Sequence, residues 1–254
     1  MVIENLLDKL AQDKGHLSNS QIGSMLKCPA QYEFSYIKGI KMPPPGAMIQ
    51  GSAYHKGVET GYKFKKNKLE NPSEKFVQEA ADEGWAERLK AEPEIEWKGS
   101  DPGGLKDQVM DIVAKYAREI IPTITPLDVE QWETLNINGI NFVRVRDLVT
   151  ATGVIDHKLA ARKYDPSKKY NDLQSLAYLY PNGGKFEYHV ATKTLKKEIQ
   201  IADYSRTKAE VDWWVILVGK VYAQIKSGNF PPNPTGFFCS PEWCGYWKLC
   251  RERR

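Results

Sequence analysis

The spacing of apolar residues changes from a helical to a strand period about halfway along the chain. In the first half, apolar positions three and four residues apart predict three helices, over residues 51–68, 73–90 and 105–121. The Ser18-Asn19-Ser20-Gln21 segment resembles a capping box, which predicts a shorter helix running from it toward Cys28. We therefore expect the segment 17–125 to be mainly helical.

Past Pro126 the apolar positions alternate, as in a half-buried sheet. We expect strands over residues 129–135, 142–146, 154–158, 186–192 and 198–201. The Asn138-Gly139 pair is a strong hairpin signal between the first two strands, and Ala151-Thr152-Gly153 turns the chain into the third. A helix over 171–180 interrupts the strands, and a long helix over 205–227 follows them.

The order of these elements predicts a mixed α/β fold with an added helical layer. We expect one domain over residues 1–254, in which a sheet core over 126–204 carries the chemistry. Residues 205–254 hold the last helix and a cluster of cysteines. On the last helix, the residues expected on the buried side are Val211, Trp214, Val215, Val218, Val221 and Ile225.

Composition narrows the class of protein only slightly. The chain has 254 residues, 36 Lys+Arg against 32 Asp+Glu and a net charge of +4, so a nucleic-acid partner is permitted but not required. Hydrophobic residues at 41% argue against wholesale disorder. No apolar run approaches the roughly 18 residues that a membrane helix needs. The charged N-terminus does not look like a secretory signal, so we expect a cytoplasmic protein.

The sharpest chemical pattern lies on two consecutive strands. Asp156 and Lys158 are two residues apart and should share one face of a strand, whereas His157 should face away. Asp147 precedes the turn on the neighbouring strand, so the two carboxylates could share a divalent ion such as Mg²⁺. The alternative interpretation is a cross-strand ion pair at the surface.

The chain has four cysteines, Cys28, Cys239, Cys244 and Cys250. Three of them are close together near the C-terminus and interleave with aromatic residues, whereas Cys28 can join them only through the fold. Four thiolates suit either Zn²⁺ or a 4Fe–4S cluster. Free or disulfide-paired thiols are the weaker alternatives.

Five segments resemble, in order, the motifs of the PD-(D/E)XK nuclease superfamily. Within it, the chain looks most like the RecB-like iron–sulfur exonucleases, such as CRISPR-associated exonucleases, the nuclease domains of AddB-type helicase–nucleases and phage-encoded relatives. The segments are Leu17-Ser18-Asn19-Ser20-Gln21-Ile22 with Cys28-Pro29, Gly51-Ser52-Ala53-Tyr54-His55, Asp147 with Asp156-His157-Lys158, Gln174-Ser175-Leu176-Ala177-Tyr178, and the C-terminal cysteines.

This resemblance implies a restriction-endonuclease-like core with a mixed central sheet and a C-terminal iron–sulfur staple. His55, Asp147 and Asp156 would bind catalytic Mg²⁺ or Mn²⁺, with Glu130 as a further candidate ligand. Lys158 would be the catalytic lysine. Gln174 and Tyr178 would line the active site or contact DNA. The four cysteines would hold a 4Fe–4S cluster, with zinc as the alternative.

The implied activity is a metal-dependent DNA exonuclease acting on single- or double-stranded ends in recombination, repair or phage DNA processing. Arg144 replaces a glycine usual in relatives, and only eight residues separate Asp147 from Asp156. These departures keep open a non-catalytic DNA-binding or adaptor module, and a structure-specific endonuclease is a further alternative. Three basic stretches, 63–68, 163–169 and 193–197, either follow the DNA backbone or are solvated loops.

Overall fold

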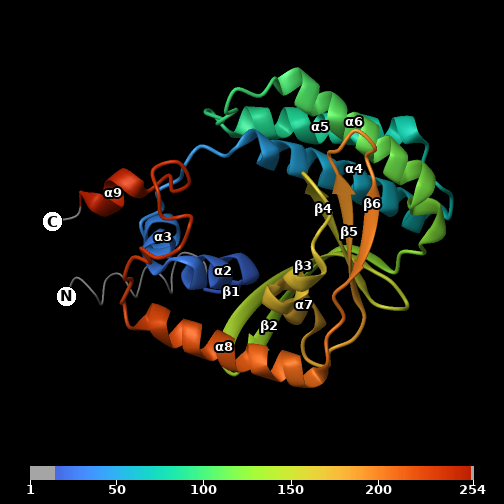
Figure 1. Cartoon of the computed structure of the whole chain (residues 1–254). Helices are drawn as coiled ribbons and strands as arrows, with labels where there is room; N and C mark the ends of the chain where they lie inside the picture. Colours follow the sequence, from blue (N-terminus) through green and yellow to red (C-terminus); the bar gives the residue numbers. More distant parts are fainter. Residues whose placement is uncertain (1–14, 253–254) are drawn as a thin grey trace. The chain divides into compact units, whose positions relative to one another are not determined.

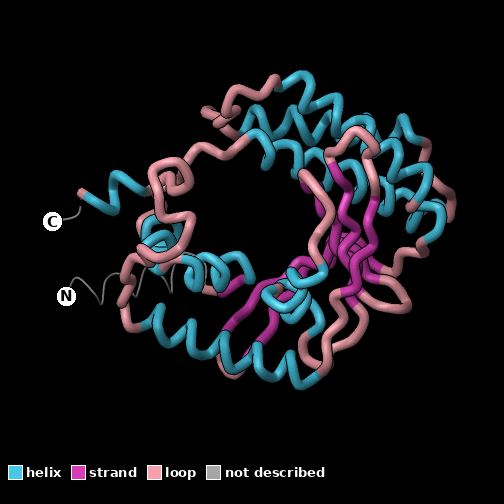
Figure 2. Tube along the Cα trace, viewed as in Figure 1, coloured by secondary structure: helices cyan, strands magenta, loops and turns pink. Residues whose placement is uncertain are grey.

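The computed structural model describes residues 15–252, whose helices and strands are drawn in Figures 1 and 2. These residues form two compact units. Unit 1 contains residues 15–42, 133–144 and 209–252, and unit 2 contains residues 43–132 and 145–208. The single-domain organisation stays a prediction. Residues 1–14, on which the expectation of no secretory signal rests, lie outside the described residues.

Three helices form the helical part of unit 2, namely α4 (Gly46–Lys68), α5 (Glu74–Ala91) and α6 (Pro102–Glu119). The structure starts two of them earlier than the apolar pattern predicts. For α6 the reason is Asp101, whose carboxylate accepts hydrogen bonds from the backbone N–H groups of Gly103 and Gly104 at 3.1 and 2.8 Å. Pro102 then occupies the first helical turn, where its missing N–H is harmless.

The core of unit 2 lies between these helices and the strands. Its fully buried members include Tyr54, Tyr62 and Tyr116 from the helices and Ala191 from a strand. The helices approach closely at Gly57, where an added Cβ would lie 3.0 Å from the backbone oxygen of Val77. A side chain on the helix at this position would therefore push α4 and α5 apart.

The strands of unit 2 form a mixed sheet. The C-terminal part of β3 (Ile140–Val149) pairs antiparallel with β4 (Val154–Ala160), β4 pairs parallel with β5 (Phe186–Thr192), and β5 pairs antiparallel with β6 (Ile199–Asp203). The β4–β5 register sets Asp156 beside Tyr188 and His157 beside His189. Neighbours in register point to the same face, so Asp156, Lys158 and Tyr188 share one face of this sheet.

Between β4 and β5 the chain forms a 3-10 helix (η3, Pro166–Asn171) and the short helix α7 (Gln174–Leu179). The predicted helix over 171–180 is therefore too long at its start. The physical reason is Asp172, whose carboxylate accepts a hydrogen bond from the Ser175 backbone N–H at 2.8 Å and so caps a helix that begins after it.

Unit 1 begins with β1 (Leu17–Ser18), α2 (Asn19–Lys27), α3 (Pro29–Tyr32) and the π-helical turn η1 (Glu33–Ile37). β1 pairs parallel with β3, and the predicted Asn138-Gly139 hairpin joins β2 (Asp128–Ile137) to β3, with both turn residues at positive φ. The unit ends with α8 (Lys208–Lys226) and α9 (Trp247–Arg251).

The apolar face of α8 is largely the predicted one. Trp214 is fully buried and packs edge-on against Phe142, with ring centroids 5.2 Å apart. Val215 is only partly buried, because it lies at the margin of the stripe set by Val211, Trp214 and Val218. Among residues 15–252, no helix has the length and apolar character needed to cross a bilayer. The described chain is thus a mixed α/β protein with added helices, as predicted.

Candidate active site

Three side chains of unit 2 bring possible metal ligands together. His55 on α4, Glu130 on β2 and Asp147 on β3 each offer one ligand atom, and these three atoms lie within 4.8 Å of one another. His55 Nδ1 is 3.4 Å from Asp147 Oδ2. All three residues line a pocket of about 380 Å³, which Tyr178 also borders. An imidazole and two carboxylates facing a pocket are suitable ligands for Mg²⁺ or Mn²⁺.

Glu130 reaches this site through an unusual backbone conformation. Its φ is +52° although it lies inside β2. A positive φ is uncommon for any residue other than glycine and costs roughly 1–3 kcal/mol. Burial and the neighbouring charges of Asp147 and Glu59 raise the pKa of Glu130 to about 7. A cation bound among these carboxylates would relieve that repulsion, so the residues fit a metal ion.

Asp147 is held in its charged form. Burial acts to raise its pKa, but hydrogen bonding from His157 and the charges of His55 and Lys158 outweigh burial and hold the pKa at about 2. The His157 backbone N–H donates to Asp147 Oδ2 at 2.9 Å. Burial also lowers the pKa of His55, although Asp147 opposes that shift. Burial thus favours the neutral form of His55, in which an imidazole binds metal.

Asp156 lies beside this group but has partners of its own. It is fully buried, with Oδ2 2.5 Å from Lys158 Nζ, while Oδ1 accepts a hydrogen bond from Gln174 Nε2 at 2.7 Å. Burial and the charge of Asp147 raise the pKa of Asp156. Burial would lower the pKa of Lys158, but Asp156 and Asp147 raise it overall, so the ammonium stays charged.

The predicted alternation along β4 is correct. Asp156 and Lys158 form an ion pair on one face, whereas the His157 side chain is buried on the other. There it stacks on Tyr62, with ring centroids 5.6 Å apart. His189, its neighbour in register, accepts or donates a hydrogen bond of 2.7 Å with the Tyr116 hydroxyl. Both histidines are packed in the core.

Gln174 and Tyr178 lie one turn apart on α7, as their spacing predicts. Gln174 Nε2 donates to Asp156 and also to the Tyr178 hydroxyl, the latter at 2.9 Å. One amide group thus joins α7 to the carboxylate on β4. The structure brings both residues to the candidate site; any contact with DNA stays a prediction.

Sequence reasoning missed two polar residues that support Gln174. The Tyr188 hydroxyl donates to Asp172 Oδ1 at 2.8 Å and to Gln174 Oε1 at 3.3 Å. Asp172 also caps α7, so it fixes both the start of the helix and the Tyr188 hydroxyl. An Asp three residues before Ser175, at the start of an apolar helix, is the capping signal that could have identified it.

The two departures from the family pattern have local explanations. Arg144 is buried, and its Nε donates to Glu133 Oε2 at 2.8 Å, so its charge is paired within unit 1. In the β3–β4 hairpin, Leu148 pairs with Ile155. Asp147 directly precedes this pair on β3 and Asp156 directly follows it on β4. The short separation is therefore what a tight hairpin requires.

In unit 1, all four cysteines line one small cavity, together with the rings of Phe34, Phe238, Tyr246 and Trp247. Two N–H groups donate to cysteine sulfurs: Gln31 Nε2 lies 3.3 Å from Cys244 Sγ, and the Asn233 backbone nitrogen lies 3.4 Å from Cys28 Sγ. The fold therefore brings Cys28 beside the C-terminal cysteines, and a metal site shared by the four stays a prediction.

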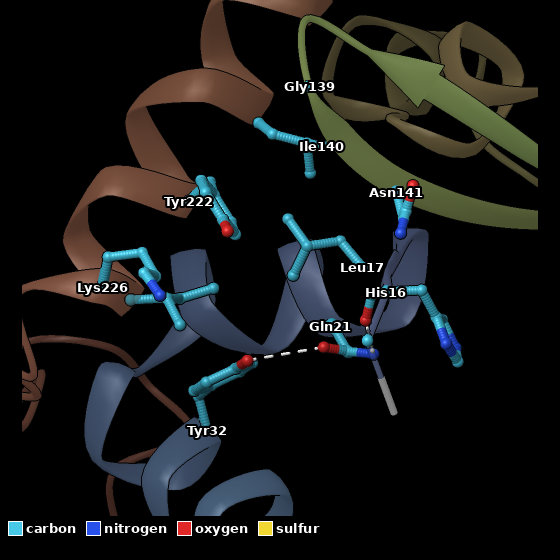
Figure 3. Close-up of a pocket in the computed structure, with 11 residues that line it drawn as sticks. His16, Leu17, Gln21, Tyr32, Gly139, Ile140, Asn141, Tyr222 and Lys226 are labelled. Carbon is cyan, nitrogen blue, oxygen red and sulfur yellow. Dashed lines mark hydrogen bonds between the residues drawn. The ribbon is translucent and has the colours of Figure 1, made fainter. Parts of the chain in front are cut away.

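A second cavity of unit 1, of about 290 Å³, lies beside β1, the β2–β3 turn and α8 (Figure 3). Its deepest polar contact is a hydrogen bond of 3.4 Å from the Tyr32 hydroxyl to Gln21 Oε1. Lys226 and Tyr222 of α8 also face it (Figure 3). Gln21 and Tyr32 satisfy each other, and this cavity lacks the carboxylates that gather in unit 2.

Most lysines of the first basic stretch have partners within the protein. Lys66 pairs with Asp128 at 2.7 Å, Lys63 pairs with Glu59, and Lys65 donates to the Ile121 carbonyl at 2.7 Å. In the third stretch Lys193 donates to Gln50 at 2.9 Å and Lys197 pairs with Asp111. These pairings leave the second stretch, after β4, as the best candidate for DNA contacts.

The mixed central sheet with its added helices is the fold of a nuclease superfamily. The family model of the PD-(D/E)XK nuclease superfamily matches residues 16–251, and the chain belongs to this superfamily. Among solved structures, the chain is similar to a protein from Eubacterium rectale described as a candidate exonuclease. The TM-score is 0.62 at 15% identity, covering 99% of this chain and 92% of that one, which shows a shared fold. No curated protein matches the chain.

Proposed function

We propose that the protein is a Mg²⁺- or Mn²⁺-dependent deoxyribonuclease that hydrolyses phosphodiester bonds at DNA ends. The observation that supports it best is the gathering of His55, Glu130 and Asp147 beside the buried Asp156–Lys158 pair. Membership of a nuclease superfamily and the fold shared with a candidate exonuclease also support it. Single- or double-stranded DNA ends are the proposed substrate.

Each side chain has a defined part in this proposal. His55, Glu130 and Asp147 hold the metal ion, and Asp156 joins them on the side of Lys158. A divalent ion held by these residues would polarise the phosphate and lower the pKa of the attacking water. Lys158, kept protonated by its carboxylate neighbours, faces the developing negative charge and stabilises it. Gln174 and Tyr178 hold the Asp156 carboxylate in one orientation.

The cysteines of unit 1 are proposed to hold a 4Fe–4S cluster, as in RecB-like exonucleases. All four cysteines line one cavity of unit 1, and four thiolates suit either a 4Fe–4S cluster or Zn²⁺. The resemblance to RecB-like iron–sulfur exonucleases favours the cluster. The cluster would pin the C-terminal segment of unit 1 to α3.

Such an enzyme would act in the cytoplasm, in recombination, repair or phage DNA processing. The fold alone also accommodates a structure-specific endonuclease or a non-catalytic DNA-binding module. Of these, the catalytic interpretation is favoured by the charged Lys158 beside two carboxylates, an arrangement that simple DNA binding does not require.

Cleavage assays separate the three functions. Wild-type protein is incubated with end-labelled linear DNA, single- and double-stranded, and with covalently closed circles, in Mg²⁺, Mn²⁺ or EDTA. An exonuclease degrades linear DNA in metal and leaves circles intact, whereas cutting of circles indicates an endonuclease. Binding without cleavage in either metal would identify the non-catalytic module.

The matched variants are Asp156→Asn and Asp107→Asn. Asp107 is an exposed carboxylate on α6 and serves as the control for loss of one negative charge. Only Asp156→Asn should abolish cleavage, with the melting temperature and cysteine-site absorbance retained. Equal cleavage by Asp156→Asn and wild type would refute the site. For the cysteines, brown protein absorbing near ~400 nm with about four irons supports the cluster, and stoichiometric zinc overturns it.

A further inference from the structure

The loop that joins β4 to α7, residues 161–173, carries basic side chains that the fold does not use. Arg162 is exposed and has no ion pair or hydrogen-bond partner among the described residues. The Lys168 ammonium lies 3.3 Å from the centroid of the Tyr164 ring, a cation–π contact, and has no carboxylate partner among the described residues. By contrast, Lys163 is paired with Glu198 at 3.0 Å.

These side chains surround a cavity rather than a flat surface. The cavity, of about 710 Å³, is lined by residues 160–166 and by Lys168. Its one carboxylate, Asp165, accepts hydrogen bonds from the Ser167 backbone N–H at 2.8 Å and hydroxyl at 2.6 Å, and is outnumbered by three basic side chains. The cavity thus offers an excess of positive charge.

The loop is held in place by β6. The Tyr164 backbone N–H donates to Gln200 Oε1 at 2.8 Å, and Gln200 Nε2 donates back to the Tyr164 carbonyl at 3.1 Å. A side chain of β6 therefore satisfies both backbone groups of Tyr164. Lys163, through its pair with Glu198, fixes the same part of the loop. The cavity wall is consequently preorganised.

A short chain of contacts links this cavity to the candidate active site. The Tyr164 ring packs edge-on against Tyr188, with centroids 5.7 Å apart, and Lys158 Nζ lies 5.4 Å from the Tyr188 centroid. Burial raises the pKa of Tyr164 and lowers that of Lys168, and the charge of Lys158 lowers both, while Asp172 acts to raise both. The cavity therefore lies within a few nucleotides of the phosphodiester bond that would be cleaved beside Lys158.

We propose that Arg162 and Lys168 bind a phosphate of the DNA strand close to the scissile phosphate, with Tyr164 holding Lys168 in position. A guanidinium and an ammonium that converge on one cavity match the geometry and charge of a phosphodiester. This subsite rests on the proposed nuclease function and adds the recognition of one strand along the β4–α7 loop. Tyr164 is a positioning residue in this arrangement.

The test measures DNA binding without cleavage. All proteins carry Asp156→Asn, and the probe is a fluorescent single-stranded oligonucleotide in Ca²⁺ at several salt concentrations. Arg162→Ala/Lys168→Ala is compared with the matched control Lys75→Ala/Lys90→Ala, which removes two exposed lysines of α5. Loss of the contact to this one phosphate should reduce the slope of log Kd against log salt by about 0.7 and weaken binding several-fold. The control pair should leave the slope unchanged.

A methylphosphonate scan then locates the phosphate. One neutral linkage is placed in turn at each position of the oligonucleotide. At one position the neutral linkage should weaken binding to the protein that carries Asp156→Asn alone. It should not weaken binding to the protein that also carries Arg162→Ala/Lys168→Ala, because there the phosphate contact is already absent. Tyr164→Leu should give part of the loss.

The outcomes separate this subsite from the activity on which it rests. Suppose that wild-type protein cleaves DNA. The subsite alone is then overturned if Arg162→Ala/Lys168→Ala leaves the salt slope unchanged, or if methylphosphonate weakens binding equally with and without this double substitution. If wild-type protein binds DNA without cleaving it, but Arg162→Ala/Lys168→Ala still reduces the salt slope, the nuclease function is overturned and the phosphate site is kept. Absence of any DNA binding overturns both.

Discussion

Gln174 Nε2 donates a hydrogen bond of 2.7 Å to the fully buried carboxylate of Asp156. The same amide nitrogen donates to the Tyr178 hydroxyl, and its oxygen accepts from Tyr188. The amide therefore has no freedom to turn, since rotation would set its oxygen against the carboxylate. This contact joins a helix to a strand at the point where the proposed chemistry occurs.

We expect Gln174→Ala to reduce cleavage by about 10- to 100-fold, the usual effect of removing a partner that orients a metal-site carboxylate. Metal affinity, measured by titration with Mn²⁺, should fall in parallel, while the fold is kept. Gln224→Ala on α8 is the control for loss of a glutamine from a helix. Unchanged cleavage by Gln174→Ala would show that Asp156 is oriented without it.

The places of Asp156, Lys158 and Gln174 could be predicted from sequence because each depends on local periodicity. A strand places residues two apart on one face, and a helix places residues four apart on one side. His157 was assigned to the opposite face for the same reason, and it packs there against Tyr62.

Other parts of the site depend on contacts that no local pattern records. The positive φ of Glu130, which helps aim it at Asp147, has no signal in a segment that reads as regular strand. The helices α6 and α7 begin at other residues than the apolar spacing predicts, because the carboxylates of Asp101 and Asp172 accept hydrogen bonds from the first backbone N–H groups. The Asp172–Tyr188 contact needs the parallel β4–β5 register, which forms only in the folded sheet.

Glu130 should make metal-free stability depend on pH. In the folded state its carboxyl keeps a proton up to about pH 7, whereas in the unfolded chain it loses the proton near pH 4.5. The folded state binds more protons between these values, so the free energy of unfolding should fall as pH rises from about 4.5 to 7. Thermal unfolding in EDTA across this range measures the effect.

Glu130→Gln is the matched variant for this prediction. In EDTA it should melt at the same temperature as wild type at pH 4 and higher than wild type at pH 8. Adding Mn²⁺ at pH 8 should raise the melting temperature of wild type more than that of the variant. A variant that loses stability equally at both pH values would show that Glu130 is not held against other carboxylates.

Lys158→Met should separate catalysis from metal binding. The change removes the ammonium that faces Asp156 and keeps an unbranched side chain of similar length. We expect cleavage to fall by about 10²- to 10³-fold, as when one preorganised electrostatic group is lost. Mn²⁺ should still bind, because His55, Glu130 and Asp147 remain. Lys185→Met, which breaks an exposed pair with Glu187, should leave cleavage unchanged.

The cysteine site should respond to its hydrogen bonds as well as to its ligands. Gln31 Nε2 donates to Cys244 Sγ, and such a bond stabilises added negative charge on the sulfur. Gln31→Leu should therefore lower the reduction potential of a cluster without lowering the iron content, whereas Cys244→Ser should lower the iron content. Redox titration followed by absorbance measures the first effect. An unchanged reduction potential in Gln31→Leu would show that Gln31 does not tune the cluster.

Arg206 should hold the β4–α7 loop in its active shape. It is buried, and its Nε donates to Ser175 Oγ at 2.8 Å while its guanidinium contacts the carbonyls of Lys169 and Asp172. Removing it leaves a buried hydroxyl and a carbonyl with fewer hydrogen-bond partners, which costs roughly 1–3 kcal/mol each.

Arg206→Ala should therefore lower stability and increase amide hydrogen exchange over 166–179. Cleavage should fall with it, because Gln174 lies in this segment. Arg118→Ala, which removes an exposed arginine paired with Glu74, should leave stability close to that of wild type. If amide hydrogen exchange over 166–179 is the same in Arg206→Ala as in wild type, the loop is held in place by its contacts with β6 instead.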